Sequence, residues 1–196
     1  WDPYRKKVGN NRERMTRSVS LKKESLPHPQ GLGDWTKIQW NKFDIFYGIP
    51  IEFNKLFKDI YQQDTINYFR LTEYAHGVDF KEEQIQIGKA IKVTSGEDIT
   101  IAALGSQLKT ALKASESLKS NGISAEIIYY HTFKPFDSEC LQESIRKTRH
   151  LISLEELSVH DGLFNQCLKS IIGISDVKCS QMAVNDFIRG YGYQGA

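Results

Sequence analysis

The second half of the chain alternates between two patterns of apolar and polar positions. Residues 99–104, ITIAAL, are a short uncharged run of β-branched and small residues, typical of a strand buried on both faces of a parallel sheet. Residues 107–121 change to a helical period: charged residues, mostly lysines, lie opposite the inward positions Leu108, Ala111, Leu112, Ser115 and Leu118. Asn121-Gly122 predicts the end of this helix.

The same alternation continues toward residue 196. We expect Ser106 to cap the first helix, Asp137 or Ser138 to cap a second, a third helix from about 161, and strands at 124–130, 151–154 and 177–182. Strands that alternate with helices predict an α/β fold, here a three-layer α/β/α domain with a mostly parallel sheet. Residues 87–93 and 99–104 flank a turn at 95–98, so we predict a hairpin and one antiparallel edge strand.

The segment 43–71 predicts another strand, helix and strand. Gly48-Ile49-Pro50 supplies a turn, and Pro50 suits the first turn of a helix. That helix places Phe53, Leu56, Phe57 and Ile60 on one face. We therefore divide the chain into a basic, incomplete or loop-rich segment (1–42), this strand-helix-strand unit (43–73), a linker (74–87) and the α/β domain (88–196).

Composition narrows the class of protein. The chain has 196 residues, and no apolar run approaches the roughly 18 residues that cross a bilayer. No signal-peptide pattern begins it. Its three cysteines, Cys140, Cys167 and Cys179, have no metal-ligand spacing, which favours buried thiols in a reducing compartment. We expect a cytoplasmic location, with an organelle matrix as the alternative.

The charge is uneven along the chain. The overall charge is +2, but residues 1–23 contain eight Lys and Arg residues against Asp2 and Glu13, so the remainder is acidic. A basic arm with aromatic residues is one way to bind nucleic acid. This segment has neither helical periodicity nor regularly spaced aromatics, so we favour a solvated segment and do not expect nucleic acid as a partner.

Five short motifs in the second half of the chain resemble motifs of the C-terminal domain of transketolase-like thiamine diphosphate enzymes. They occur in the family's order and spacing: GEDITI (96–101), TALKASESL (110–118), GISAEII (122–128), HTFKPFD (131–137) and LEE (154–156). Residues 43–71 are similar to the closing strand, helix and strand of the family's pyrimidine-binding domain. The resemblance implies a subunit that transfers a two-carbon ketol unit. It also implies thiamine diphosphate and Mg²⁺ as cofactors of the complete enzyme.

The resemblance suggests two substrate-binding residues. His28, in HPQGLGD (28–34), is similar to a family histidine that lines the substrate channel, and Arg70 ends the strand phrase YFRL (68–71). Arg70 has a second interpretation as a structural ion-pair partner. Glu73 occupies the place where many transketolases have an arginine that grips a sugar phosphate, and a carboxylate there would repel that phosphate.

The sequence lacks the motifs with which members of this family hold the cofactor. We find neither the Gly-Asp-Gly…Asn diphosphate motif nor the glutamate that activates the cofactor. We therefore predict no catalytic, cofactor-binding or metal-binding residue here, and we expect the C-terminal part of a larger enzyme that is inactive in isolation. Its partner would be a second copy or a subunit that carries the diphosphate-binding domain.

Other candidate residues have structural interpretations that we prefer. Glu155-Glu156 ends a strand, where ligands of open α/β sheets gather, but the family uses this segment for the turn and for subunit contacts. We expect His131 to form hydrogen bonds at its turn, and we assign His76 to the linker. Two alternative functions remain open: the beta subunit of a 2-oxo acid dehydrogenase complex, and a non-catalytic dimerisation module.

Overall fold

A five-stranded sheet forms the larger part of the structure, a computed structural model that describes residues 43–48, 50–61, 63, 65–72 and 75–186. Four strands are parallel, and the first in the sheet order is antiparallel to its neighbour. This confirms an α/β fold with a mostly parallel sheet and one antiparallel edge strand. The strand order is β3 (Ile91–Thr94), β5 (Ala125–Tyr130), β4 (Ile99–Leu104), β7 (His150–Ser158) and β8 (Lys178–Val184).

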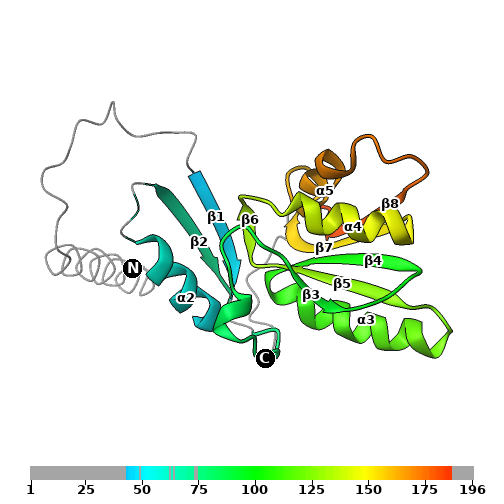
Figure 1. Cartoon of the computed structure of the whole chain (residues 1–196), viewed down its shortest axis with the longest axis horizontal. Helices are drawn as coiled ribbons and strands as arrows, with labels where there is room; N and C mark the ends of the chain where they lie inside the picture. The colour runs from blue at the N-terminus through cyan, green and yellow to red at the C-terminus, as the bar shows by residue number, and fades with distance from the viewer. Residues whose placement is uncertain (1–42, 49, 62, 64, 73–74, 187–196) are drawn as a thin grey trace, which may run out of the picture. The chain divides into compact units, whose positions relative to one another are not determined.

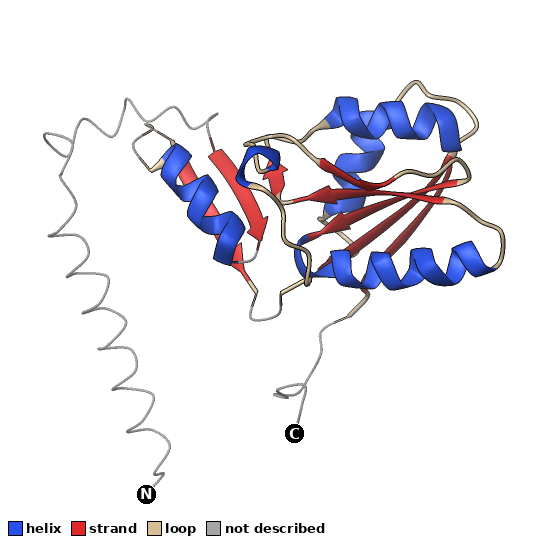
Figure 2. Ribbon diagram, turned by 60° about the horizontal axis from the view of Figure 1, so that its bottom comes forward, coloured by secondary structure: helices blue, strands red, loops and turns tan. Residues whose placement is uncertain are grey.

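Helices cover both faces of this sheet (Figures 1 and 2). Helix α3 (Leu108–Ser120) packs on one face, and α4 (Ser138–Thr148) and α5 (Leu163–Ile171) pack on the other. Each helix follows a strand and precedes a parallel one, as the alternating pattern predicts. The three-layer α/β/α arrangement is therefore confirmed.

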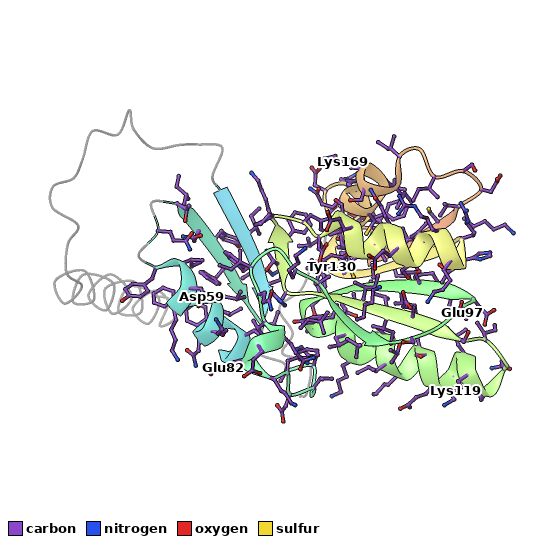
Figure 3. The ribbon with its side chains drawn as sticks, in the orientation of Figure 1. Asp59, Glu82, Glu97, Lys119, Tyr130 and Lys169 are labelled. Atoms are coloured by element: carbon purple, nitrogen blue, oxygen red, sulfur yellow. The ribbon has the colours of Figure 1, made fainter. Side chains whose placement is uncertain are left out.

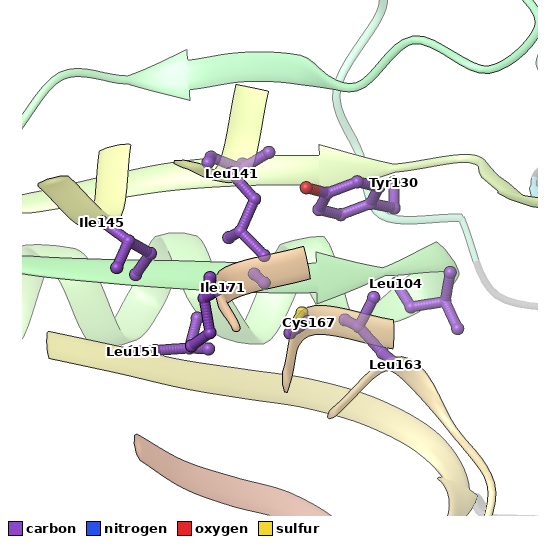
Figure 4. Close-up of a cluster of buried hydrophobic side chains, with 10 residues drawn as sticks. Leu104, Tyr130, Leu141, Ile145, Leu151, Leu163, Cys167 and Ile171 are labelled. Atoms are coloured by element: carbon purple, nitrogen blue, oxygen red, sulfur yellow. The ribbon is translucent and has the colours of Figure 1, made fainter. Parts of the chain in front are cut away.

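The two faces have separate apolar cores because successive side chains of a strand point to opposite faces. On β4, Ala102 and Leu104 face α4 and α5, whereas Ile101 and Ala103 face α3. Figure 4 shows the first core, which contains Leu104, Tyr130, Leu141, Ile145, Leu151, Leu163, Cys167 and Ile171. In Figure 3, Tyr130 lies at the end of β5, where its side chain is buried, whereas Lys119 near the end of α3 points outward.

The predicted hairpin between 87–93 and 99–104 is wrong. Strand β3 begins only at Ile91 and pairs antiparallel with β5, while both edges of β4 are occupied by the parallel strands β5 and β7. The chain crosses the start of β5 at Gly96, where a Cβ would lie 2.3 Å from the backbone carbon of Ala125. A glycine at this close approach lets the turn pass over β5 rather than fold back beside β4.

The helix starts agree with the sequence in one case and differ in another. Asp137 caps α4, since its carboxylate accepts a hydrogen bond from the Cys140 amide at 3.2 Å. Ser106 does not cap α3: it lies in the short 3₁₀ turn η3 (Gly105–Gln107), and its hydroxyl donates to Glu156. That contact joins two segments far apart in the sequence.

A second, three-stranded sheet has the order β2 (Ile66–Leu71), β1 (Phe43–Gly48) and β6 (Thr132–Lys134). Strands β1 and β2 are parallel and are connected by α2 (Pro50–Ile60), which confirms the strand-helix-strand prediction. Strand β6 follows β5 in the chain and pairs antiparallel with β1. A core around Phe46, Leu56 and Ile60 also receives Ile85, just after the 3₁₀ turn η2 (Glu82–Gln84).

None of the helices in the described part of the chain is both long and apolar enough to cross a bilayer.

Candidate functional site

Arg70 and Tyr47 lie side by side at the carboxyl ends of β2 and β1. The two residues are paired in the parallel register, and the Arg70 guanidinium carbon lies 5.8 Å from the centre of the Tyr47 ring. This geometry is a cation–π contact. Burial raises the pKa of the Tyr47 hydroxyl, and Arg70 partly opposes this shift, so Tyr47 stays a neutral platform for the cation at physiological pH.

Tyr47 connects this strand end to the larger sheet. Its amide donates a hydrogen bond to the His131 carbonyl at 2.8 Å, and its ring meets Phe133 edge to face at 5.8 Å. Its Cβ lies 3.6 Å from the position that a Cβ on Gly105 would occupy, directly after β4. The carboxyl ends of β1, β2 and β4 therefore approach one another, and ligands of α/β proteins gather at such ends.

Arg70 thus lies where the sequence predicted, at a strand end. Among the described residues its guanidinium contacts an aromatic ring and forms no ion pair with a carboxylate. His28 and Glu73 lie outside the described residues, so their substrate-end roles stay predictions.

Glu155 has a structural role in the described chain. Its buried carboxylate accepts hydrogen bonds from the amides of Leu163 (2.5 Å) and Phe164 (3.1 Å), the first residues of α5. Gln181 of β8 donates to the same carboxylate at 3.2 Å. A carboxylate at a helix N-terminus satisfies free amides and complements the helix dipole. These contacts support a structural role for Glu155 rather than a role as a general base.

Glu156 contacts the side of the sheet that α3 covers, opposite to the side of Glu155. Its exposed carboxylate accepts hydrogen bonds from the Ser106 hydroxyl and from the Gln107 side chain, the latter at 3.1 Å. Both donors belong to the turn that leads into α3. Adjacent strands β4 and β7 are therefore joined at their carboxyl ends by side chains as well as by the sheet.

A buried polar cluster joins α2 to β5, and the sequence did not reveal it. The Glu52 carboxylate accepts hydrogen bonds from His76 Nε2 at 3.0 Å and from the Tyr129 hydroxyl at 2.9 Å. The Val78 amide donates to His76 Nδ1 at 3.2 Å, which leaves the proton on Nε2. Burial raises the pKa of Tyr129, and the Glu52 charge raises it further, so the phenol remains a donor.

One signal could have identified this cluster. Glu52, Leu56 and Ile60 are spaced by four along α2, and all three are buried, so Glu52 belongs to the apolar face of its helix. A buried carboxylate requires donors. Assigning His76 to the linker did not identify it as one of these donors, and the structure buries its side chain, which is 2% exposed.

His131 lies next to this cluster. Its Nδ1 lies 3.0 Å from the Thr132 hydroxyl, which agrees with the predicted hydrogen bond at its turn. Its Nε2 is buried and has no hydrogen-bond partner among the described residues. Burial lowers the pKa of His131 to about 4, although Glu52 acts in the opposite direction, so the ring is neutral at pH 7.

The described residues do not offer a metal centre. Within them, no group of three or more His, Cys, Asp or Glu side chains is placed to hold an ion.

The comparisons with known proteins agree with the resemblance in the sequence. The family model of the transketolase C-terminal domain matches residues 88–194. A 6-deoxy-6-sulfo-D-fructose transketolase subunit from Clostridium sp. (strain MSTE9) is 38% identical over 108 residues, 55% of this chain and 34% of that protein. A pyruvate dehydrogenase E1 component subunit beta from Rickettsia bellii (strain RML369-C) is 39% identical over 85 residues, 42% of this chain and 26% of that protein.

A solved structure is similar over a longer segment. It is described as a split gene transketolase, inactive beta4 tetramer, and it superposes with a TM-score of 0.68 at 26% identity. The match covers 74% of this chain and 48% of that one. The chain thus spans less than two thirds of the length of each of these three relatives.

Proposed function

Because the chain belongs to the transketolase C-terminal domain family, we propose that it is the C-terminal part, or a separate subunit, of a thiamine diphosphate-dependent transketolase-like enzyme. The complete enzyme would transfer a two-carbon ketol unit. The observation that carries this proposal is the family match over 88–194, in a chain that spans about a third of a transketolase subunit. We further propose a cytoplasmic location.

In this proposal the chain contributes assembly and part of the substrate cleft. Thiamine diphosphate, when bound by the complete enzyme, supplies the nucleophilic carbon of the transfer. We assign the cofactor and Mg²⁺ to a partner subunit or to another part of the protein. The relative described as a beta4 tetramer supports an assembly of several such chains.

Arg70 would bind the substrate in this cleft, together with His28. The contact with Tyr47 supports the role of Arg70, because the neighbouring ring restricts the orientation of the guanidinium at the strand end. A planar guanidinium suits a carboxylate, a phosphate or a sugar hydroxyl. Glu73 would disfavour a phosphate tail on that substrate.

The test is reconstitution of the enzyme. The chain is co-expressed with a partner that carries the Gly-Asp-Gly…Asn motif, and ketol transfer is measured with thiamine diphosphate and Mg²⁺. We expect activity from the pair and none from the isolated chain, and calorimetry should detect no tight cofactor binding by the chain alone. Micromolar cofactor binding by the isolated chain would contradict the assignment of the cofactor to a partner.

Variants at the substrate end give a sharper test in the reconstituted enzyme. Arg70→Ala should lower kcat/KM by roughly tenfold to a hundredfold, with partial recovery in Arg70→Lys. Arg146→Ala, on the exposed side of α4, is the matched control. Glu73→Arg should raise the preference for a phosphorylated over a dephosphorylated donor. An unchanged preference would remove Glu73 from the cleft.

The beta subunit of a 2-oxo acid dehydrogenase is the second candidate. The identity with the Rickettsia bellii subunit, 39% over 85 residues, favours it over unrelated functions. Such a subunit would support decarboxylation of a 2-oxo acid and acyl transfer to lipoyl, which is measured with the same reconstituted pair. A chain that assembles but supports neither reaction would be a dimerisation module.

A further inference from the structure

Phe133 is the extra residue of a β-bulge in β6. The residues Ile45 and Phe46 are adjacent in β1, whereas their partners in β6 are two residues apart, so Phe133 has no partner in the register. A bulge bends its strand and redirects a side chain, and bulges occur often beside functional sites. This bulge lies in the HTFKPFD motif (131–137), which links the larger sheet to the smaller one.

The ring of Phe133 meets Tyr47 of β1. The two rings are arranged edge to face, with their centroids 5.8 Å apart, which is a favourable aromatic geometry. The Tyr47 amide also donates a hydrogen bond to the His131 carbonyl at 2.8 Å. The segment that follows β5 therefore holds both the backbone and the side chain of Tyr47.

Tyr47 in turn contacts Arg70, its register partner on β2, whose guanidinium carbon lies 5.8 Å from the centre of the ring. The preceding register pair, Phe46 and Phe69, stacks in the core beneath α2. Because side chains alternate along a strand, Tyr47 and Arg70 lie on the opposite face of the smaller sheet. Phe133, Tyr47 and Arg70 thus form a row of contacts from β6 across β1 to β2.

The row ends at a guanidinium that pairs with no carboxylate among the described residues. A free arginine side chain samples many rotamers, and the freedom that it loses when it binds a ligand reduces affinity. A contact that restrains the side chain before the ligand arrives lowers this cost. The aromatic row is placed to restrain Arg70 in this way.

We propose that Tyr47 and Phe133 are positioning residues for Arg70: the bulge of β6 fixes the Tyr47 ring, and the ring holds the guanidinium at the carboxyl end of β2 for the polar end of the substrate. The inference rests on the proposed function for the substrate, whereas the restraint on Arg70 is a property of the chain alone. It gives the HTFKPFD motif a part in substrate binding without a direct contact.

The first test measures the mobility of Arg70 in the full chain without a partner. NMR relaxation of the Arg70 Nε–H bond gives its order parameter, and Arg70→Lys identifies the signal by its loss. We expect a value well above that of Arg146, which is exposed on α4. Tyr47→Leu should lower the value to below about 0.6, the range of flexible groups, and Tyr47→Phe, which keeps the ring, should restore most of it.

Phe133→Leu tests the second contact of the row. It removes the edge-to-face partner but leaves Tyr47 in place, so the order parameter of Arg70 should fall by less than in Tyr47→Leu. Tyr61→Leu is the matched control, since Tyr61 is 47% exposed and stacks on Phe57 of α2. A value that Tyr47→Leu or Phe133→Leu leaves unchanged would overturn the proposal, as would an equal fall in Tyr61→Leu.

A double-mutant cycle in the reconstituted enzyme measures the effect on the substrate. Tyr47→Leu should lower kcat/KM roughly threefold to tenfold, mainly through a higher KM, with recovery in Tyr47→Phe. In an Arg70→Ala background the same substitution should have little further effect, because a positioning residue acts through the group that it positions. Additive effects of the two substitutions would show a general structural role and would overturn the proposal.

A failure of the proposed function gives a different result. The order parameter is measured on the chain alone, whereas ketol transfer is measured in the pair reconstituted with the diphosphate-binding partner. A pair without ketol transfer, built from a chain in which Tyr47 restrains Arg70, would contradict the proposed function and support the positioning of Arg70.

Discussion

Glu155 and Glu156 are neighbours on β7, yet their carboxylates contact two different helix starts on opposite faces of the sheet. Glu155 accepts from the first amides of α5, and Glu156 accepts from Ser106 and Gln107 in the turn before α3. Alternation along the strand gives each face one carboxylate. The pair therefore anchors both helical layers to the carboxyl end of β7.

The two glutamates should differ in their contribution to stability. Glu155→Ala leaves buried amides of Leu163 and Phe164 without an acceptor, and we expect it to lower the free energy of unfolding by about 2–3 kcal/mol. Glu156→Ala removes an exposed acceptor and should cost less than about 1 kcal/mol. Urea denaturation of both variants measures the difference. Equal losses would contradict the assignment of the buried cap to Glu155.

Gly162 should not tolerate a side chain. A Cβ at this position would lie 1.8 Å from Glu155 Oε2 and 2.6 Å from its carboxyl carbon. Gly162→Ala must displace the carboxylate from the start of α5, so we expect a loss of about 2 kcal/mol or more and a lower Tm. Asp161→Ala, at the exposed preceding residue, is the control. A Gly162→Ala protein as stable as this control would show that Glu155 is free to move.

The adjacent residues Tyr129 and Tyr130 provide a matched pair of hydroxyl deletions. Tyr129 donates to the Glu52 carboxylate at 2.9 Å, whereas Tyr130 donates to the neutral Asp137 carbonyl at 3.2 Å. Removing a hydrogen-bond donor from a buried carboxylate costs more free energy than removing one from a carbonyl. Tyr129→Phe should therefore lower the free energy of unfolding by about 2 kcal/mol and Tyr130→Phe by about 1 kcal/mol. Thermal and urea unfolding of the two variants test this order, and the reverse order would contradict it.

His131 should make the fold sensitive to mild acid. Its pKa is about 4 in the folded chain and about 6.5 when unfolded, so between these values only the unfolded chain binds a proton. The contribution of His131 to the free energy of unfolding is therefore constant above pH 6.5 and decreases as the pH falls toward 4. At pH 5 the decrease is about 2 kcal/mol. Urea unfolding at pH 7.5 and 5 should show a smaller pH dependence in His131→Asn than in the wild type. His160→Asn, at an exposed histidine, serves as the control.

Local patterns predicted most of the elements because they are local properties of the chain. The ITIAAL run became β4, and the 107–121 period became α3 with a one-residue difference at each end. Asp137 capped its helix as expected, since a cap requires only an acceptor just before the first turn. The position of Arg70 at a strand end also followed from its own segment.

Strand pairing was less predictable. The 95–98 turn suggests a hairpin, but β4 has two parallel partners from distant segments, and β3 is left to pair with β5. The contact between Arg70 and Tyr47 likewise depends on the parallel register of β1 and β2, which a helix separates in the sequence.

The sequence alone determined the α/β class, the helical faces and the resemblance to transketolase C-terminal domains, because periodicity and motif order need no knowledge of which segments meet. Only the tertiary structure decided that Glu52, His76 and Tyr129 share one buried network, since the three lie on α2, on the segment after β2 and on β5. It also placed β8 at one edge of the larger sheet, after β7. Burial and pairing are properties of distant contacts, and a side chain acquires them only when the layers pack.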